Sequence, residues 1–467
     1  MLQHGIPVPP AFVIGTDVCA EFYAAGKALP PSLLTELQFA VAELEERSGK
    51  TFGRGDTPLL VSVRSGAATS MPGMMDTVLN LGMNAEVEAA LARVTGDATF
   101  AADTHQRFIE QFTHVVGHAP PSDPWAQLHD AITAVFASWM SERAIRYRAS
   151  RGLADNAGTA VTVQAMVFGN LDAQSGTGVL FSRDPNTGER TPYGEWLTCG
   201  QGEEVVSGRR TPEPLSSLAS LLPEAHARLL DMSDQFERLG QDVQDIEFTV
   251  EAGKLWLLQS RAAKRTPQAA IRLAVSLCEE GLISREQALE RITPAHLSAA
   301  RQPVIDPAAF RQATLLAEGK PACPGVVKGI LLTDVEKAEV RAEAGESIIL
   351  ARPTTDPDDV HVMSIVSGVL TELGGSTSHA AVVSRELGVP CIVGCGANAL
   401  STLDGQPVTV DATNGKVYAG TLAIQPALGS NNPDLVTLQE WAIQTWSLPP
   451  GTPLSQALAG RSSPLDA

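Results

Sequence analysis

Residues 374–383 read GGSTSHAAVV and place His379 on the first turn of an expected helix. The apolar residues 364–373 predict a strand that ends at the glycine pair, and residues 380–387 predict the helix. The free N–H groups and partial positive charge of a helix N-terminus attract phosphate and favour a neutral, nucleophilic imidazole. The motif therefore indicates a histidine that carries phosphate. A histidine placed at a helix start for structural reasons is the alternative.

A second candidate site follows a short strand predicted at residues 58–63. Residues 62–77 read SVRSGAATSMPGMMDT, which combines an arginine with small and hydroxyl residues. Such a loop can bring backbone N–H groups to phosphate oxygens, with Ser65 and the glycines Gly66 and Gly73 in the loop and Arg64 supplying a forked, permanent charge. Phosphate binding and an ordinary chain turn explain the pattern about equally well.

A third candidate site lies on two adjacent strands predicted between residues 244 and 260. Asp245 and Glu247 are two residues apart and therefore share a strand face, as do Gln259 and Arg261. If the connecting loop has an odd number of residues, all four side chains point the same way.

A three-residue loop at residues 251–253 meets this condition, with Gly253 in the left-handed position. Two carboxylates beside an amide would hold Mg²⁺, and the arginine would meet metal-bound phosphates. A solvated strand face with a surface ion pair is the alternative.

Weaker candidates lie elsewhere. The glycine-containing residues 176–185 and 201–203 either line a nucleotide pocket or only turn the chain. His105, His114 and His118 fall on a predicted helix without a matching cluster of metal ligands, and we interpret them as structural.

The composition limits the classes of protein to which the chain can belong. The 467 residues suffice for two or three domains, and 44% are hydrophobic, as in a globular protein. With 34 basic and 53 acidic residues the net charge is −19, which argues against nucleic acid or an anionic membrane as a partner. Six cysteines without a CxxC pair favour a reducing, cytoplasmic location. The first ten residues lack the basic start of a leader, so we expect no leader segment, and no apolar run reaches membrane-spanning length.

Helical and strand patterns alternate along the chain and predict an α+β fold with several domains. The expected elements are helices at 33–46 and over most of 84–148, strands between 159 and 260, a helical connector over 267–300, and a second compact unit over 321–418. The last stretch, from about residue 425, is rich in Pro, Ser and Leu and forms either a docking arm or a frayed tail.

Three separated motifs together resemble the pyruvate, phosphate dikinase family. They are residues 60–80, the strand pair at residues 244–261, and residues 377–381, which read TSHAA. The similarity runs in register from about residue 5 to 422.

The resemblance implies a fold and a division into domains. Residues 1–264 would form an ATP-grasp nucleotide-binding domain with a helical subdomain at about 85–150, and residues 265–318 a helical linker. Residues 319–422 would form a swivelling phosphohistidine domain, followed by a tail at 423–467. The implied fold class is thus α+β or α/β, with several domains.

The resemblance also assigns roles. His379 would be the phosphocarrier, with Arg64 and Arg261 holding the ATP phosphates and the phosphate cosubstrate. Asp245, Glu247 and Gln259 would hold Mg²⁺. The nucleotide-binding set would be completed by Ser65, Gly66, Gly73, Gln164 and Gln259. Thr377 matches a regulatory phosphorylation site of plant family members, although nothing in this chain indicates that regulation.

Two departures from the family pattern affect the expected function. In the family, a glycine-lysine segment precedes the stretch that resembles residues 5–9, and its lysine contacts ATP phosphates; this segment is missing here. The second departure is that only about 45 residues follow residue 422, which leaves no room for a pyruvate-binding barrel. We therefore expect ATP and phosphate to phosphorylate His379, giving AMP and pyrophosphate, and the phosphoryl group to pass in trans to pyruvate on a separate barrel protein.

Other functions remain open at this point. One is a phosphocarrier or regulatory nucleotide-binding protein without catalysis, which the missing lysine favours. Another is a kinase for a different small-molecule acceptor. Family members commonly form homodimers.

Overall fold

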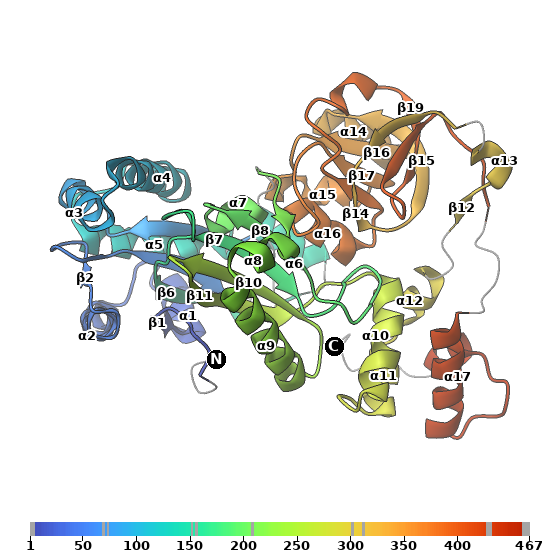
Figure 1. Cartoon of the computed structure of the whole chain (residues 1–467), viewed down its shortest axis with the longest axis horizontal. Coiled ribbons are helices and arrows are strands. Elements are labelled where there is room, and N and C mark those ends of the chain that lie inside the picture. The colour runs from blue at the N-terminus through green and yellow to red at the C-terminus, as the bar shows by residue number, and fades with distance from the viewer. Residues whose placement is uncertain are drawn as a thin grey trace. The chain divides into compact units, whose positions relative to one another are not determined.

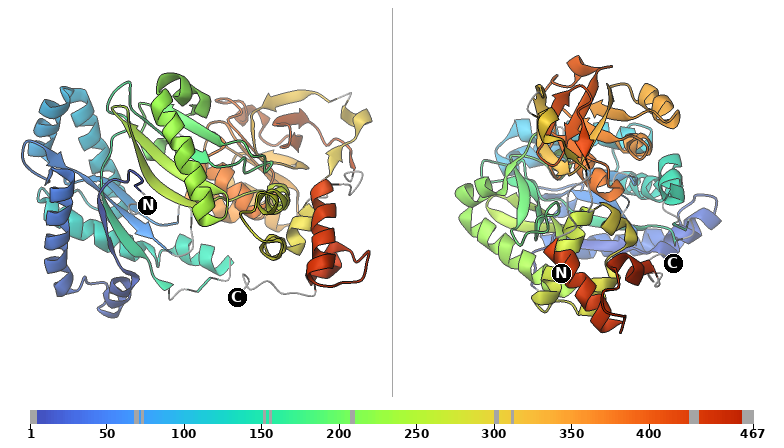
Figure 2. Two further views of the ribbon diagram at one scale, coloured as in Figure 1. Left: turned by 60° about the horizontal axis from the view of Figure 1, so that its bottom comes forward. Right: turned by 90° about the vertical axis from the view of Figure 1, so that its right-hand side faces the viewer.

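The computed structural model describes residues 5–67, 71, 74–150, 153–154, 157–206, 210–299, 303–310, 313–425 and 432–459. The chain divides into two compact units, one formed by residues 1–175 and 250–256 and the other by residues 176–249 and 257–467. Figures 1 and 2 show the helices and strands in three views. Mixed α and β elements in both units confirm the expected α/β multidomain character.

The first unit is built on a four-stranded antiparallel sheet in the order β1-β6-β4-β5. Its strands are β1 (Ala11–Ile14), β2 (Thr51–Phe52), β3 (Pro58–Leu59), β4 (Val61–Gly66), β5 (Thr77–Leu81) and β6 (Ala160–Ala165), of which β2 and β3 form a separate pair. Its helices are α1 (Thr16–Ala24), α2 (Pro31–Ser48), α3 (Ala85–Thr95), α4 (Ala98–Val116), α5 (Pro124–Ser138) and α6 (Glu142–Ser150). The helices predicted at 33–46 and within 84–148 are therefore confirmed.

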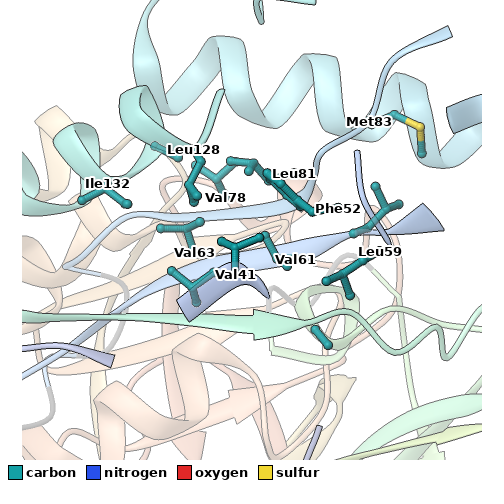
Figure 3. Packing of buried hydrophobic residues seen from close by; sticks show 14 of the residues in the cluster. Val41, Phe52, Leu59, Val61, Val63, Val78, Leu81, Met83, Leu128 and Ile132 are labelled. Carbon is teal, nitrogen blue, oxygen red and sulfur yellow. The ribbon is translucent and has the colours of Figure 1, made fainter. Parts of the chain in front are cut away.

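The core of the first unit lies between this sheet and its helices. Figure 3 shows Val61 and Val63 of β4 beside Val41 of α2 and Leu128 of α5. Helix α5 packs against β4, β5 and β6, because its apolar residues recur at helical spacing on one side. This packing fixes β4, the strand that carries Arg64.

The second unit contains a five-stranded sheet in the order β11-β10-β7-β8-β9. Its strands are β7 (Gly176–Phe181), β8 (Tyr193–Thr198), β9 (Glu213–Pro214), β10 (Gln244–Glu251) and β11 (Lys254–Ala262). The accompanying helices are α7 (Gly202–Val206), α8 (Leu215–Leu221) and α9 (Pro223–Gly240).

A buried ion-pair network ties this sheet to two helices. Arg183, which follows β7 and is fully buried, contacts Glu237 of α9 at 2.6 Å and Glu280 at 2.7 Å. Glu280 ends the helix α10 (Pro267–Glu279). Burial acts to lower the pKa of Arg183, but hydrogen bonds to the two carboxylates outweigh it and raise that pKa.

The expected connector and the end of the chain form one helical layer. Helices α10, α11 (Arg285–Glu290) and α12 (Pro294–Ala299) pack against α17 (Pro433–Thr445) and α18 (Leu454–Ala459), as Figure 2 shows for α17. Leu438 and Trp441 of α17 share a hydrophobic cluster with α10. The stretch that we expected to be a docking arm or a frayed tail thus contains two packed helices.

The second unit also contains an eight-stranded mixed sheet in the order β13-β20-β19-β15-β16-β17-β18-β14. The strands are β13 (Leu315–Glu318), β14 (Lys320–Cys323), β15 (Val326–Leu332), β16 (Ile348–Arg352), β17 (Gly368–Thr371), β18 (Cys391–Val393), β19 (Pro407–Asp411) and β20 (Lys416–Ala419); β12 (Val304–Ile305) and β21 (Ile424–Gln425) pair separately. The helices are α13 (Pro307–Phe310), α14 (Val335–Glu343), α15 (Val360–Met363) and α16 (His379–Leu387), with short 3₁₀ turns at Pro357–Asp359 and Ser401–Leu403.

Strands β15 to β18 run parallel, as expected where helices alternate with strands. The strand predicted at 364–373 is shorter than expected, since only β17 is extended, whereas the helix predicted at 380–387 begins one residue earlier. All six cysteines are free. Within the described ranges, no helix is long and apolar enough to cross a bilayer.

Candidate functional site

His379 begins α16, directly after the segment that follows β17. Gly388 ends the helix in a left-handed conformation, as is common at helix C-termini. Helix α16 packs against β14, β17 and β18 through Ala380, Ala381 and Val383, and this packing holds the start of the helix, where the histidine lies. The sequence therefore predicted the local setting of His379 correctly.

The two ring nitrogens of His379 have different surroundings. Nδ1 lies 3.1 Å from the hydroxyl of Thr355, whereas Nε2 is buried and makes no hydrogen bond among the described residues. The hydroxyl of Ser378 is also buried without a partner there. Ser378 is the N-cap residue, but its side chain does not cap the helix as its type suggested. Buried polar atoms are usually paired, so this cluster suits a polar group from outside the chain.

Burial lowers the pKa of His379, and the carboxylates of Asp359 and Asp356 oppose that shift only in part. The ring is therefore neutral at pH 7, as the sequence suggested, but burial is the main cause. Thr355, Asp356 and Asp359 were not predicted as neighbours of His379 from the sequence. The available signal was that these hydroxyl and acidic residues follow soon after the end of a strand, β16.

In the same unit, the β10–β11 hairpin brings together the predicted acidic and basic side chains. Arg261 Nε donates to Asp245 Oδ2 at 2.8 Å, and its NH2 group lies 4.0 Å from Glu247 Oε1. Burial acts to lower the pKa of Arg261, but the charge of Asp245 and then that of Glu247 outweigh it and raise the pKa. Gln259 lies half-buried on β11.

The turn of this hairpin differs from the expected one. The strands end at Glu251 and resume at Lys254, so the turn has two residues instead of three. Ala252 has φ 47° and Gly253 φ 77°, so both residues are left-handed. A two-residue hairpin turn often has positive φ at both residues. Asparagine, aspartate or glycine would signal such a turn in the sequence, but alanine does not.

Asp245 has one free oxygen that fits a cation. Oδ2 is held by Arg261, whereas Oδ1 is buried and has no hydrogen-bond partner among the described residues. Carboxylate oxygens are the ligands that Mg²⁺ prefers. Asp245 and the half-exposed Glu247 therefore form a donor set that fits this ion.

The first unit carries a separate group of predicted residues. Arg64 NH2 donates to Gln164 Oε1 at 2.7 Å, so β4 and β6 bring these two side chains together. Ser65 is half-buried, and a Cβ added to Gly66 would meet nothing nearer than 3.8 Å. The backbone at Gly66 is thus open to close approach. Gly73 lies outside the described residues.

Arg143 of α6 holds residues 74–76, which follow the loop after β4, and this role was not predicted from the sequence. Its guanidinium donates to the carbonyl of Met74 at 3.3 Å and forms an ion pair with Asp76. Among the weaker candidates, His105 pairs with Glu88 and His118 with Asp130, as expected of structural histidines.

Two family models match the chain. Residues 25–217 match the pyruvate phosphate dikinase AMP/ATP-binding domain, and residues 344–415 match the mobile domain of PEP-utilising enzymes. The second match contains His379 and the first contains Arg64. The chain belongs to the pyruvate, phosphate dikinase family.

Several pyruvate, phosphate dikinases are similar over most of the chain. That of Rhizobium meliloti is 40% identical over 95% of the chain and 57% of its own length. Pyruvate, phosphate dikinase 2 of Zea mays is 39% identical over the whole chain and 58% of its own length, and the Clostridium symbiosum protein is 38% identical over 91% and 55%. The chain thus spans a little over half the length of these dikinases.

Proposed function

We propose that the chain performs the ATP half-reaction of a pyruvate, phosphate dikinase. The observation that carries this proposal is the start of α16, where His379 Nε2 and the Ser378 hydroxyl are buried without a hydrogen-bond partner among the described residues and burial lowers the pKa of His379. The AMP/ATP-binding and mobile-domain matches support the same function. We assign residues 1–264 to an ATP-grasp domain, 265–318 to a linker, 319–422 to a swivelling domain and 423–467 to a C-terminal segment.

In the proposed step, Nε2 of His379 attacks the β-phosphorus of ATP, the bond between that phosphorus and the oxygen that bridges to the α-phosphate breaks, and AMP leaves. The proposal places the ring proton on Nδ1, which lies 3.1 Å from the Thr355 hydroxyl, so that the lone pair is on Nε2. Inorganic phosphate then attacks the γ-phosphorus, the bond between that phosphorus and the oxygen that bridges to the β-phosphate breaks, and pyrophosphate leaves. The β-phosphoryl group stays on Nε2.

The remaining proposed site residues bind and orient phosphates. Arg64, Ser65, Gly66, Gly73 and Gln164 would hold ATP phosphates from the first unit, and Arg261 and Gln259 from the second. Asp245, Glu247 and Gln259 would hold Mg²⁺, which neutralises phosphate charge when bound. The phosphoryl group would then pass to pyruvate outside these two domains.

Labelling with ATP that carries radioactive phosphorus at the β position tests the proposal. After denaturation, the wild-type chain should retain label that is labile in acid and stable in base, and His379→Ala should retain none. His361→Ala is the matched control, because this exposed histidine of the same domain forms a surface ion pair with Glu339 at 3.2 Å. It should label as the wild type does.

Nucleotide binding by the wild-type chain without any covalent label would contradict the proposal. In that case the regulatory nucleotide-binding function would account for the chain better.

A further inference from the structure

A bidentate ion pair closes the open end of the β10–β11 hairpin, at the end opposite its two-residue turn. Arg265, which follows β11, donates from its two terminal nitrogens to the two carboxylate oxygens of Asp242, both at 2.6 Å. Nε of the same guanidinium donates to the carbonyl of Ala263 at 3.1 Å. One side chain therefore binds the chain just before β10 and the chain just after β11.

The carboxylate of Asp242 accepts from further donors. Oδ1 accepts from the N–H of Val243 at 2.8 Å and lies 3.5 Å from a terminal nitrogen of Arg291, which directly follows α11. The side chains of Asp242 and Arg265 are each only 18% exposed. A forked guanidinium on a carboxylate fixes the geometry of the two groups as well as their charge.

The pair is ionised at neutral pH. Burial acts to raise the pKa of Asp242, but the hydrogen bonds and the charge of Arg265 outweigh it and lower that pKa. The interaction between Asp242 and Arg265 is therefore one of two full charges in a largely buried setting, where such pairs are stronger than at the surface.

This ion pair lies close along the strands to the proposed phosphate and magnesium ligands. The N–H of Ala263 donates to the carbonyl of Val243 at 2.8 Å, and two residues further along each strand Arg261 meets Asp245. Three residues of strand span about 10 Å, so Asp242 lies within that distance of Asp245 along the chain.

The register of the two strands decides what Asp245 offers to a metal ion. Arg261 occupies Oδ2 of Asp245 and leaves Oδ1 without a partner among the described residues. A slip of one residue between paired strands moves the side chains of one strand to the other face of the sheet. Gln259 and Arg261 would then face away from Asp245 and Glu247.

We propose that Asp242 is a positioning residue that, through Arg265, holds the register of the β10–β11 hairpin and so keeps Asp245 and Arg261 arranged for Mg²⁺ and phosphate. This inference rests on the proposed function, which assigns Asp245 to Mg²⁺. Asp242 is not itself a proposed ligand. Its loss should therefore weaken metal binding only through the position of Asp245.

Hydrogen exchange tests the contact without requiring activity. Asp242→Asn removes the negative charge and keeps the size of the side chain, and it should speed exchange of the Ala263 amide by about tenfold or more. Asp434→Asn is the matched control, because Asp434 of α17 is 17% exposed and pairs with Arg272 at 3.7 Å in the helical layer. This control should leave the Ala263 amide protected, and an equally protected amide in Asp242→Asn would overturn the inference.

Mn²⁺ serves as the probe for the metal site, because its electron paramagnetic resonance signal reports binding without turnover. The nucleotide is α,β-methylene ATP, whose bridge between the α- and β-phosphorus cannot be broken in the proposed step. Loss of a residue that orients metal ligands typically weakens metal binding about 10–100-fold, so the Kd of Mn²⁺ should rise at least about tenfold in Asp242→Asn. Asp434→Asn should bind as the wild type does, and an unchanged Kd in Asp242→Asn would overturn the inference.

A magnesium titration of single-turnover labelling separates positioning from a merely structural role. In Asp242→Asn the Mg²⁺ concentration for half-maximal rate should rise about tenfold, and the rate at saturating Mg²⁺ should approach that of the wild type. A pair that only stabilises the fold would instead lower the labelled fraction at every Mg²⁺ concentration and leave the half-maximal concentration unchanged. That second pattern would overturn the inference.

Arg265 approaches the same pair from the other side. Arg265→Gln removes the pair as Asp242→Asn does, so the double variant should need no more Mg²⁺ than Arg265→Gln alone, and additive effects would overturn the inference. Arg265→Lys keeps the charge but loses the fork, and it serves if Asp242→Asn does not fold. Its Mg²⁺ requirement should also rise, and a requirement equal to that of the wild type would count against the inference.

The two proposals fail in different ways. If the wild type is never labelled but Asp242→Asn still speeds exchange and weakens Mn²⁺ binding, the proposed function fails and the positioning of the hairpin stands. If the wild type is labelled and neither exchange nor the metal requirement responds to Asp242, only the positioning role fails.

Discussion

At the scale of single residues, His379 differs from an ordinary surface histidine in its two ring nitrogens: Nδ1 contacts the Thr355 hydroxyl, whereas Nε2 is buried and has no partner in the part of the chain that the structure describes. Its pKa is lowered mainly by burial, so the ring stays neutral to a lower pH than a free imidazole does. Protonation removes the lone pair that a nucleophile needs. The pH dependence of labelling therefore reports on this environment.

We expect the labelling rate to fall only below the ordinary histidine value of about pH 6.5, as the pH passes the lowered pKa of His379. Asp356→Asn should move this midpoint lower still, because it removes a charge that favours the protonated ring. The measurement is the single-turnover labelling rate between pH 5 and pH 8. A midpoint above 6.5 would contradict the assigned environment.

Residue types predicted part of this site. The sequence correctly indicated contacts between Arg261 and the carboxylates of Asp245 and Glu247, although the three-residue loop on which that expectation rested is a two-residue turn. Two contacts near His379 were not predicted. Thr355 lies 24 positions from His379, and Glu195, whose Oε2 accepts from the N–H of Thr377, lies 182 positions from Thr377. Such contacts depend on the order of the strands in the sheets, and the local sequence pattern does not determine that order.

At the scale of elements, β7 is held to α9 and α10 through one buried arginine. Arg183 bonds to Glu237 and Glu280, and its hydrogen bond to Glu280 lowers the pKa of that carboxyl. The contribution of Glu280 to stability is therefore present above its ordinary pKa and is lost as the pH falls through the lowered one.

Arg183→Met should lower the free energy of unfolding by about 3–5 kcal/mol, because it leaves Glu237 buried without its charge partner. Arg190→Met is a matched control, since Arg190 pairs with the same Glu280 at 3.4 Å but has a side chain 71% exposed. It should cost about 0–1 kcal/mol. Urea denaturation followed by tryptophan fluorescence measures both, and equal costs would mean that burial does not set the strength of this network.

Elements with strong periodicity were predicted well, and the end of the chain was not. Helices α2 and α16 match their expected ranges closely. Helix α17 was missed although Asn432 caps it and Pro433 occupies its first turn, both typical of a helix start. The proline content of the surrounding stretch obscured this signal.

At the scale of the whole molecule, each unit is formed from segments that are distant in the sequence. The tip of the β10–β11 hairpin, residues 250–256, belongs to the first unit, although most of its two strands belong to the second. Glu251 accepts from the N–H of Phe168 at 2.8 Å, and the N–H of Ala252 donates to Ser175 at 2.8 Å.

A protein chemist who divides this chain by position alone would therefore damage the amino-terminal piece. A fragment of residues 1–175 lacks Glu251 and Ala252, whereas one of residues 1–264 keeps both. We expect limited proteolysis to cut the shorter fragment faster between residues 168 and 175, because it loses bonds of about 1–3 kcal/mol each when such groups are left unpaired. Equal cleavage rates would show that the borrowed hairpin tip is dispensable, and only then would the first 175 residues be a self-sufficient folding unit.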